Sequence, residues 1–68
     1  MQTFKLEGEF IHMIQLLKAM NLVEHGSMAQ RVVEEGLVTY NGVVDYRKRL
    51  KVRKGDIVEF EGTKIQII

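Results

Sequence analysis

The chain has 68 residues, 46% hydrophobic and 28% charged, with no cysteine and a formal net charge of +1. This size and composition predict one folded domain over residues 1–68 and exclude a disordered tail, a disulfide scaffold and thiolate catalysis. No uncharged run reaches the ~20 residues that span a bilayer and no basic segment opens the chain, so we predict no membrane span or signal peptide and a cytoplasmic location.

The first two elements differ in their hydrophobic period. Phe4 and Leu6 alternate with charged residues, which predicts a short, half-buried strand over 3–8. From Glu9 the apolar residues recur at helical spacing, which predicts an amphipathic helix that ends near Asn21. The apolar face of this helix would consist of Phe10, Met13, Ile14, Leu17 and Met20.

A second helix is predicted to begin at Ser27 and to end before Gly36. The Ser27 hydroxyl can accept a hydrogen bond from a free backbone N–H, and Gln30 would complete a Ser-x-x-Gln capping box. Two short helices this close together form a helical hairpin or a helix-turn-helix-like pair. We expect Met28, Ala29, Val32 and Val33 to form the buried face, and the methionines at 13, 20 and 28 to fill the core.

After Gly36 the pattern becomes that of strands. Asn41-Gly42 lies between β-prone runs and predicts a hairpin, because a type I′ turn needs positive φ at both central residues. A second turn is predicted at Lys54 to Asp56, and a third, of type II′, at Gly62-Thr63. The element order predicts an α+β fold with two short helices packed on a small, mainly antiparallel sheet of about four to five strands.

Positive charge is concentrated in the segment RKRLKVRK, Arg47 to Lys54, which holds six of the ten lysines and arginines. Four cations and nine anions remain elsewhere, a balance of −5. Segregation of this kind creates a local positive field that steers polyanions even when the net charge is near zero. The segment therefore favours a nucleic-acid partner.

In an extended conformation, the basic segment would place alternate cations on one side. Leu50 and Val52 would hold its other side, shared with Lys48 and Lys54, against the core. Such a ladder neutralises phosphates independently of base sequence. The alternative is an edge strand whose charges prevent aggregation. The predicted ladder consists of Arg47, Arg49, Lys51 and Arg53.

Catalysis has little support among the residue types. Ser27 is the lone serine, and His12 and His25 are thirteen positions apart without a metal-ligand spacing. No glycine-rich phosphate loop is present. We predict a protein that is not an enzyme and takes no cofactor, metal or small-molecule substrate.

Three other side chains have two interpretations. Tyr40 and Tyr46 could stack on bases, although cross-strand packing is more common for tyrosines in such positions. Arg31 could contact a phosphate or pair with Glu35 one helical turn further on.

The chain resembles the S-four RNA-binding domain, or αL motif, from Ile11 to about Phe60. The resemblance is carried by the stretch LLKAMNLVEHGSMAQRVVEEGLVTYNGVVDYRKRLKVRKGDIVEF, residues 16–60. The specific elements are LLK at 16–18, Ala29, EEGLVTYNG at 34–42 and KGD at 54–56. Within that superfamily the chain is most similar to small stand-alone bacterial YbcJ-like proteins. The resemblance implies an αL fold whose helices and hairpin form one surface for structured RNA, either ribosomal or transfer RNA, with the ribosome as a further partner.

The resemblance also implies a set of RNA-contacting residues. YbcJ-like proteins usually carry Lys where this chain has Gln30, and many S-four domains carry Ser-Arg where it has His25-Gly26. Because these cations are missing from the second helix, we expect the basic segment to make most of the RNA contacts. Gly36, Asn41, Gly42, Gly55 and Asp56 match positions with an architectural role. The implicated residues are Lys18, Gln30, Arg31, Arg47, Lys48 and Lys51, to which the ladder adds Arg49 and Arg53.

Two other functions stay open at this point. The first is a protein-interaction module of a ribosome- or RNA-associated assembly, in which the acidic remainder of the chain docks a partner and the basic segment serves solubility. The second is a small hydrolase that depends on Ser27 or His12.

Overall fold

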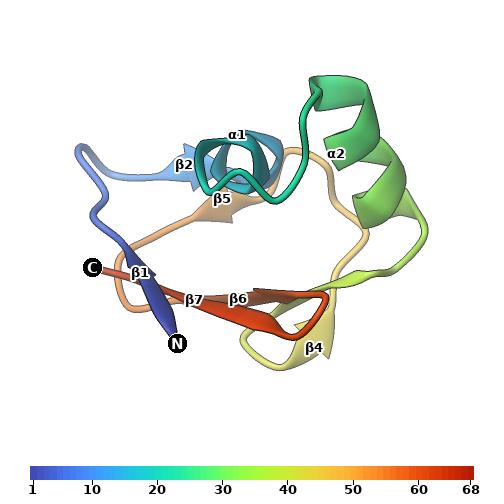
Figure 1. The fold of residues 1–68 in the computed structure, drawn as a ribbon. Coiled ribbons are helices and arrows are strands. Elements are labelled where there is room, and N and C mark those ends of the chain that lie inside the picture. Colours follow the sequence, from blue (N-terminus) through green and yellow to red (C-terminus); the bar gives the residue numbers. More distant parts are fainter.

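The computed structural model describes residues 1–68 and contains two helices and seven short strands (Figure 1). The strands β1, β7, β6, β3 and β4 form a sheet in that order, antiparallel except for the parallel pair β1–β7, and β2 pairs antiparallel with β5. The predicted α+β class is confirmed. The elements are β1 (Gln2–Phe4), β2 (Ile11–His12), α1 (Met13–Ala19), α2 (Gly26–Glu34), β3 (Val38–Tyr40), β4 (Val43–Val44), β5 (Lys51–Val52), β6 (Ile57–Phe60) and β7 (Thr63–Ile67).

The hydrophobic core lies between the helices and one face of the five-stranded sheet. Both helices stand on the same side of that sheet (Figure 1). Along β7, Ile65 and Ile67 are buried while Lys64 and Gln66 are exposed, as the alternation of strand side chains requires. The other sheet face is therefore open. Neither helix has the length and apolar character that crossing a bilayer requires.

The first helix begins at Met13 and not at Glu9 as predicted, because β2 occupies the preceding residues and pairs with β5. The backbone N–H of Met13 donates to the carbonyl of Leu50 at 2.9 Å. This bond fixes the start of α1 to the residue that follows the turn at Lys48-Arg49. Phe10 consequently lies outside the helix, with 37% of its surface exposed. Asn21 adopts a φ of 58° just after the helix, and its predicted role as a terminator is confirmed.

The second helix begins at Gly26, with His25 as its N-cap and no side-chain hydrogen bond at the cap. The predicted capping box at Ser27 is therefore wrong, since Ser27 already lies in the first turn. Met28 is 45% exposed and the prediction that it fills the core is wrong as well. The N-terminal turn of α2, which carries Met28, stands at the end of the helix remote from the sheet (Figure 1). The rest of the predicted face is buried: Ala29, Val32 and Val33.

Two-residue turns connect β3 to β4 and β6 to β7. Asn41 and Gly42 have φ values of 51° and 88°, so the predicted type I′ hairpin is confirmed. The last turn is centred on Glu61-Gly62, with φ values of 50° and 79°, and is again of the I′ kind. The prediction of a turn at Gly62-Thr63 was wrong by one residue because Thr63 already pairs with Phe60 in the β6–β7 ladder.

The side chain of Asp56 connects the turn at residues 54–56 to the β3–β4 hairpin. Its carboxylate accepts hydrogen bonds from the Tyr40 hydroxyl at 2.6 Å, the Arg53 backbone N–H at 2.8 Å and the Asn41 amide at 3.3 Å. Burial opposes ionisation of Asp56, but these three donors outweigh it and hold the pKa of the carboxyl below its usual value. The hydrogen bond to Asp56, helped by burial, raises the pKa of Tyr40.

We expect Asp56→Asn to lower the free energy of unfolding by about 1–2 kcal/mol at neutral pH, since it removes an ionised acceptor of several hydrogen bonds. The pKa of Asp56 is lower in the folded state, so the ionised carboxylate stabilises the fold above its unfolded pKa of about 4, and this contribution is lost as the pH falls through the folded value. Urea unfolding of both proteins should show the difference shrinking in acid. A difference that is constant from neutral to acid pH would contradict this assignment.

Candidate nucleic-acid interface

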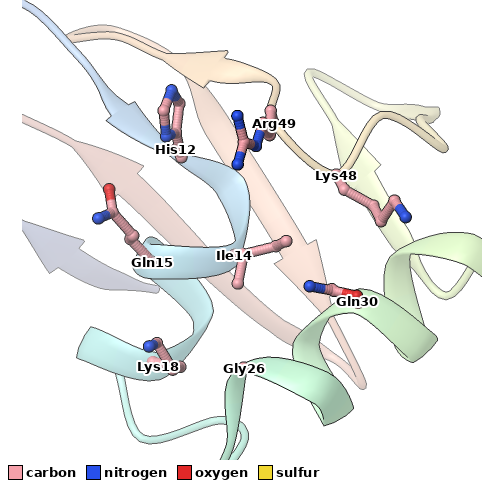
Figure 2. A pocket seen from close by; sticks show the side chains of 8 residues that line it. All are labelled: His12, Ile14, Gln15, Lys18, Gly26, Gln30, Lys48 and Arg49. Carbon is pink, nitrogen blue, oxygen red and sulfur yellow. The ribbon is translucent and has the colours of Figure 1, made fainter.

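A cleft of about 390 Å³ opens between α1, α2 and the turn that precedes β5 (Figure 2). Lys18 reaches it from α1, Gln30 from α2, and Lys48 and Arg49 from the turn. These four predicted residues come from three separate segments and lie around one opening. No carboxylate lines it. The other lining residues are His12, Ile14, Gln15 and Gly26.

Buried neighbours hold the cleft side chains in place. Lys18 directly follows the buried pair Leu16 and Leu17 on α1, so it projects from the exposed side of a packed helix. Arg49 directly precedes Leu50, which is 8% exposed. A Cβ at Gly26 would lie 3.9 Å from the Lys18 ammonium nitrogen, which places the start of α2 beside that charge. The cations therefore have fixed positions of attachment around the cleft.

One ion pair lies at the edge of the cleft. The Lys48 ammonium nitrogen is 3.6 Å from a carboxylate oxygen of Glu34, and both side chains are about half exposed. Exposed pairs of this kind contribute about 0–1 kcal/mol. A phosphate can therefore replace Glu34 as the partner of Lys48 at small cost.

Arg47 lies outside the cleft because Asp45 binds it. The Arg47 guanidinium donates to Asp45 at 2.7 and 3.0 Å, and its backbone N–H donates to the same carboxylate at 2.9 Å. The hydrogen bond from the Arg47 side chain holds the pKa of Asp45 below its usual value. Within the basic segment only Lys51–Val52 is a strand, so the predicted ladder does not extend back to Arg47.

The later part of the basic segment does alternate. Leu50 and Val52 are buried, as predicted, while Arg49, Lys51 and Arg53 are exposed. Lys48 differs from the prediction, because it lines the cleft instead of sharing the side of Leu50.

Lys51 and Arg53 lie over an aromatic ring that the sequence patterns assigned to the core. The Lys51 ammonium nitrogen is 4.9 Å, and the Arg53 guanidinium carbon 6.0 Å, from the centroid of the Phe10 ring. The His12 ring lies 5.3 Å from the same ring. The exposed position of Phe10 was not predicted, because its spacing from Met13 and Leu17 suits the buried face of a helix. No local pattern indicates a strand here, because Phe10 and Ile11 are both apolar and β5, which pairs with β2, lies much later in the chain.

Arg31 lies apart from the cleft, in a shallow hollow of about 180 Å³ beside His25, Ser27 and Met28. It forms no ion pair with Glu35. No cluster of side chains in the chain is arranged to hold a metal ion.

The two tyrosines have different environments. The Tyr40 hydroxyl is engaged by Asp56. Tyr46 is 63% exposed and its ring lies against Gly36, where a Cβ would be 3.0 Å from a ring carbon. Gly36 thus has two reasons to be glycine, the close tyrosine and a φ of 74° at the end of α2.

We expect Gly36→Ala to lower the free energy of unfolding by about 2 kcal/mol, because it combines a left-handed backbone with a clash against Tyr46. The matched control is Gly55→Ala, where φ is 94° but no atom lies within 4 Å of the new Cβ. Backbone strain alone should lower the stability of that variant by about 1 kcal/mol. Chemical denaturation of both variants measures the difference, and equal losses would show that the Tyr46 ring imposes no constraint.

The fold agrees with comparisons to known proteins. The family model described as the S4 domain matches residues 4–68. The chain belongs to the S4 domain family. This confirms the resemblance to the S-four domain seen in the sequence.

Relatives of this S4 domain protein extend over most or all of its length. The "Putative RNA-binding protein YbcJ" of Escherichia coli K12 is 35% identical over 69 residues, covering 100% of this chain and 99% of that protein. The solution structure of E. coli YbcJ, described as revealing an αL motif involved in RNA-binding, matches with a TM-score of 0.76 over 100% of this chain and 87% of that chain. The "Probable ribosome maturation protein RlbA" of Bacillus subtilis 168 is 35% identical over 57 residues, 84% of this chain and 80% of that protein.

Proposed function

We propose that this S4 domain binds structured RNA, either ribosomal or transfer RNA, through the cleft and the exposed cations beside it, and catalyses no reaction. The observation that carries the proposal is the cleft itself, in which Lys18, Lys48 and Arg49 surround one opening without a lining carboxylate. A concave surface with one sign of charge focuses the field toward a polyanion. The names of YbcJ and RlbA, which refer to RNA binding and ribosome maturation, support this choice of partner.

The construction of the cleft suits recognition of RNA shape. Its cations are attached to a packed helix and to a turn anchored by the buried Leu50, so their spacing is preset. Folded RNA presents phosphates and 2′-hydroxyls in a fixed arrangement, and such surfaces are read mainly by shape and backbone contacts. Gln15 and Gln30 add amide groups that can donate to and accept from a 2′-hydroxyl.

The cleft offers no set of groups for catalysis. His12 is its only titratable residue apart from the cations, and no serine, thiol or carboxylate lines the cleft with it. General acid–base or nucleophilic catalysis requires such a partner within hydrogen-bond reach. This supports a binding function without chemistry.

Titration of a labelled RNA hairpin with the wild-type protein at several salt concentrations tests the proposal. If the three cleft cations neutralise three phosphates, a plot of log binding constant against log salt concentration should have a slope of roughly −3 between about 50 and about 200 mM. Amide chemical shifts should move around the cleft on binding. Absence of binding, or affinity that ignores salt, would overturn the proposal, and shifts confined to other surfaces would favour the protein-interaction module.

A further inference from the structure

One face of the β2–β5 ribbon combines an aromatic ring with two cations. Antiparallel pairing sets His12 opposite Lys51 and Ile11 opposite Val52. Val52 is fully buried and Ile11 packs against the core, so the side chains that alternate with them point outward. We call this outward set the ribbon cluster; it consists of Phe10, His12, Lys51 and Arg53.

The ribbon cluster is continuous with the cleft. His12 belongs to both, because it lines the cleft and its ring lies 5.3 Å from that of Phe10. Arg49 lies beside His12 at the same end of the cleft (Figure 2). An RNA strand with its phosphates in the cleft would therefore pass His12 to reach Phe10. It would meet Lys51 and Arg53 at that ring.

The chemistry of the ribbon cluster selects its ligand. An exposed phenyl ring beside two cations suits a partner with a flat π face and a negative charge next to it, and a nucleotide has both. A base within a duplex has no free face, whereas an unpaired base can stack. Contact of Lys51 and Arg53 with the ring holds it in place, and Phe10 as a residue is 37% exposed.

We infer that Phe10 is a stacking platform for an unpaired base, and that the preferred RNA carries unpaired nucleotides next to a double-stranded stem. This inference rests on the proposed function and specifies its substrate class. The stem contacts the cleft, the first unpaired base stacks on Phe10, and Lys51 and Arg53 neutralise the phosphates that flank it.

Two hairpins with the same stem, one blunt and one with an unpaired extension of about four nucleotides, separate the two surfaces. The wild-type protein should bind the extended hairpin about tenfold more tightly. Phe10→Ala and Phe10→Leu should both remove this preference and leave affinity for the blunt hairpin within about twofold, which also shows that the variants are folded. Phe10→Leu keeps an apolar side chain, so its effect isolates stacking.

Fluorescence provides an independent readout because the chain has no tryptophan. Phe10→Trp should retain the preference, and its emission should be quenched by the extended hairpin and much less by the blunt one. The control is Gln66→Trp, exposed on the open face of the sheet, whose emission should not change. Equal quenching of Phe10→Trp by both hairpins, or a preference unchanged in Phe10→Ala, would overturn this inference alone. Failure of wild-type protein to bind either hairpin would overturn the proposed function as well.

Discussion

Reversal of the three cleft cations, in the variant Lys18→Glu, Lys48→Glu and Arg49→Glu, is expected to weaken binding of structured RNA by at least about a hundredfold near 0.1 M salt. Each substitution removes a phosphate contact and adds a repulsive charge at the same place. The three positions surround one opening, so the repulsions act together on one ligand. Fluorescence anisotropy with the labelled hairpin measures the loss.

The matched control is Lys5→Glu, Lys54→Glu and Lys64→Glu. Each reversal changes the charge by two, so both triple variants shift the formal net charge from +1 to −5. All three control lysines are exposed and none of them lines the cleft. We expect the control to bind within about tenfold of wild type, with the residual loss due to the overall field. Equal losses in the two variants would show that net charge, and not the cleft, determines affinity.

The second large effect concerns stability. Met13→Ala is expected to lower the free energy of unfolding by about 3 kcal/mol, because Met13 is 1% exposed at the start of α1 and its truncation leaves a cavity under the helix. A domain of this size has a total stability of roughly 3–10 kcal/mol, so the variant should be close to unfolding at ambient temperature. Its melting temperature should fall by about 12–24 °C.

Met28→Ala provides the control for that result, since the residue type and the substitution are the same. Met28 is 45% exposed on the first turn of α2, and its truncation should change the stability by at most about 0.5 kcal/mol. Thermal unfolding followed by circular dichroism compares the two variants. Similar losses at both positions would mean that Met28 is packed in solution, which would contradict its exposed position on α2.

The contrast between the methionines shows the limit of periodicity. Helical spacing predicts that Met13 and Met28 both lie on buried faces. Spacing alone does not show how far a helix extends beyond the core. The same limit explains Phe10, whose spacing from Met13 and Leu17 suits a helix. The residues between Phe10 and Met13 instead pair with β5, a partner much later in the chain that local hydrophobicity does not indicate.

Features that depend on one or two residues could be predicted from the order of amino acids alone. The turn at Asn41-Gly42 and the helix ends at Asn21 and Gly36 were predictable because they require positive φ, which few residue types adopt. The α+β class followed from the order of periodic segments. The resemblance to the S-four domain followed from short motifs at these same constrained positions, together with Lys54 to Asp56.

The distribution of the basic segment's cations depends instead on long-range contacts of the folded chain. Arg47 turns back to Asp45, Lys48 and Arg49 join Lys18 at the cleft, and Lys51 and Arg53 lie over Phe10 on the β2–β5 ribbon. Charge density in a sequence reports how many cations are near one another along the chain. The direction of each side chain depends on the strand, turn or carboxylate that holds its backbone, and those partners come from distant segments brought together by burial of the core.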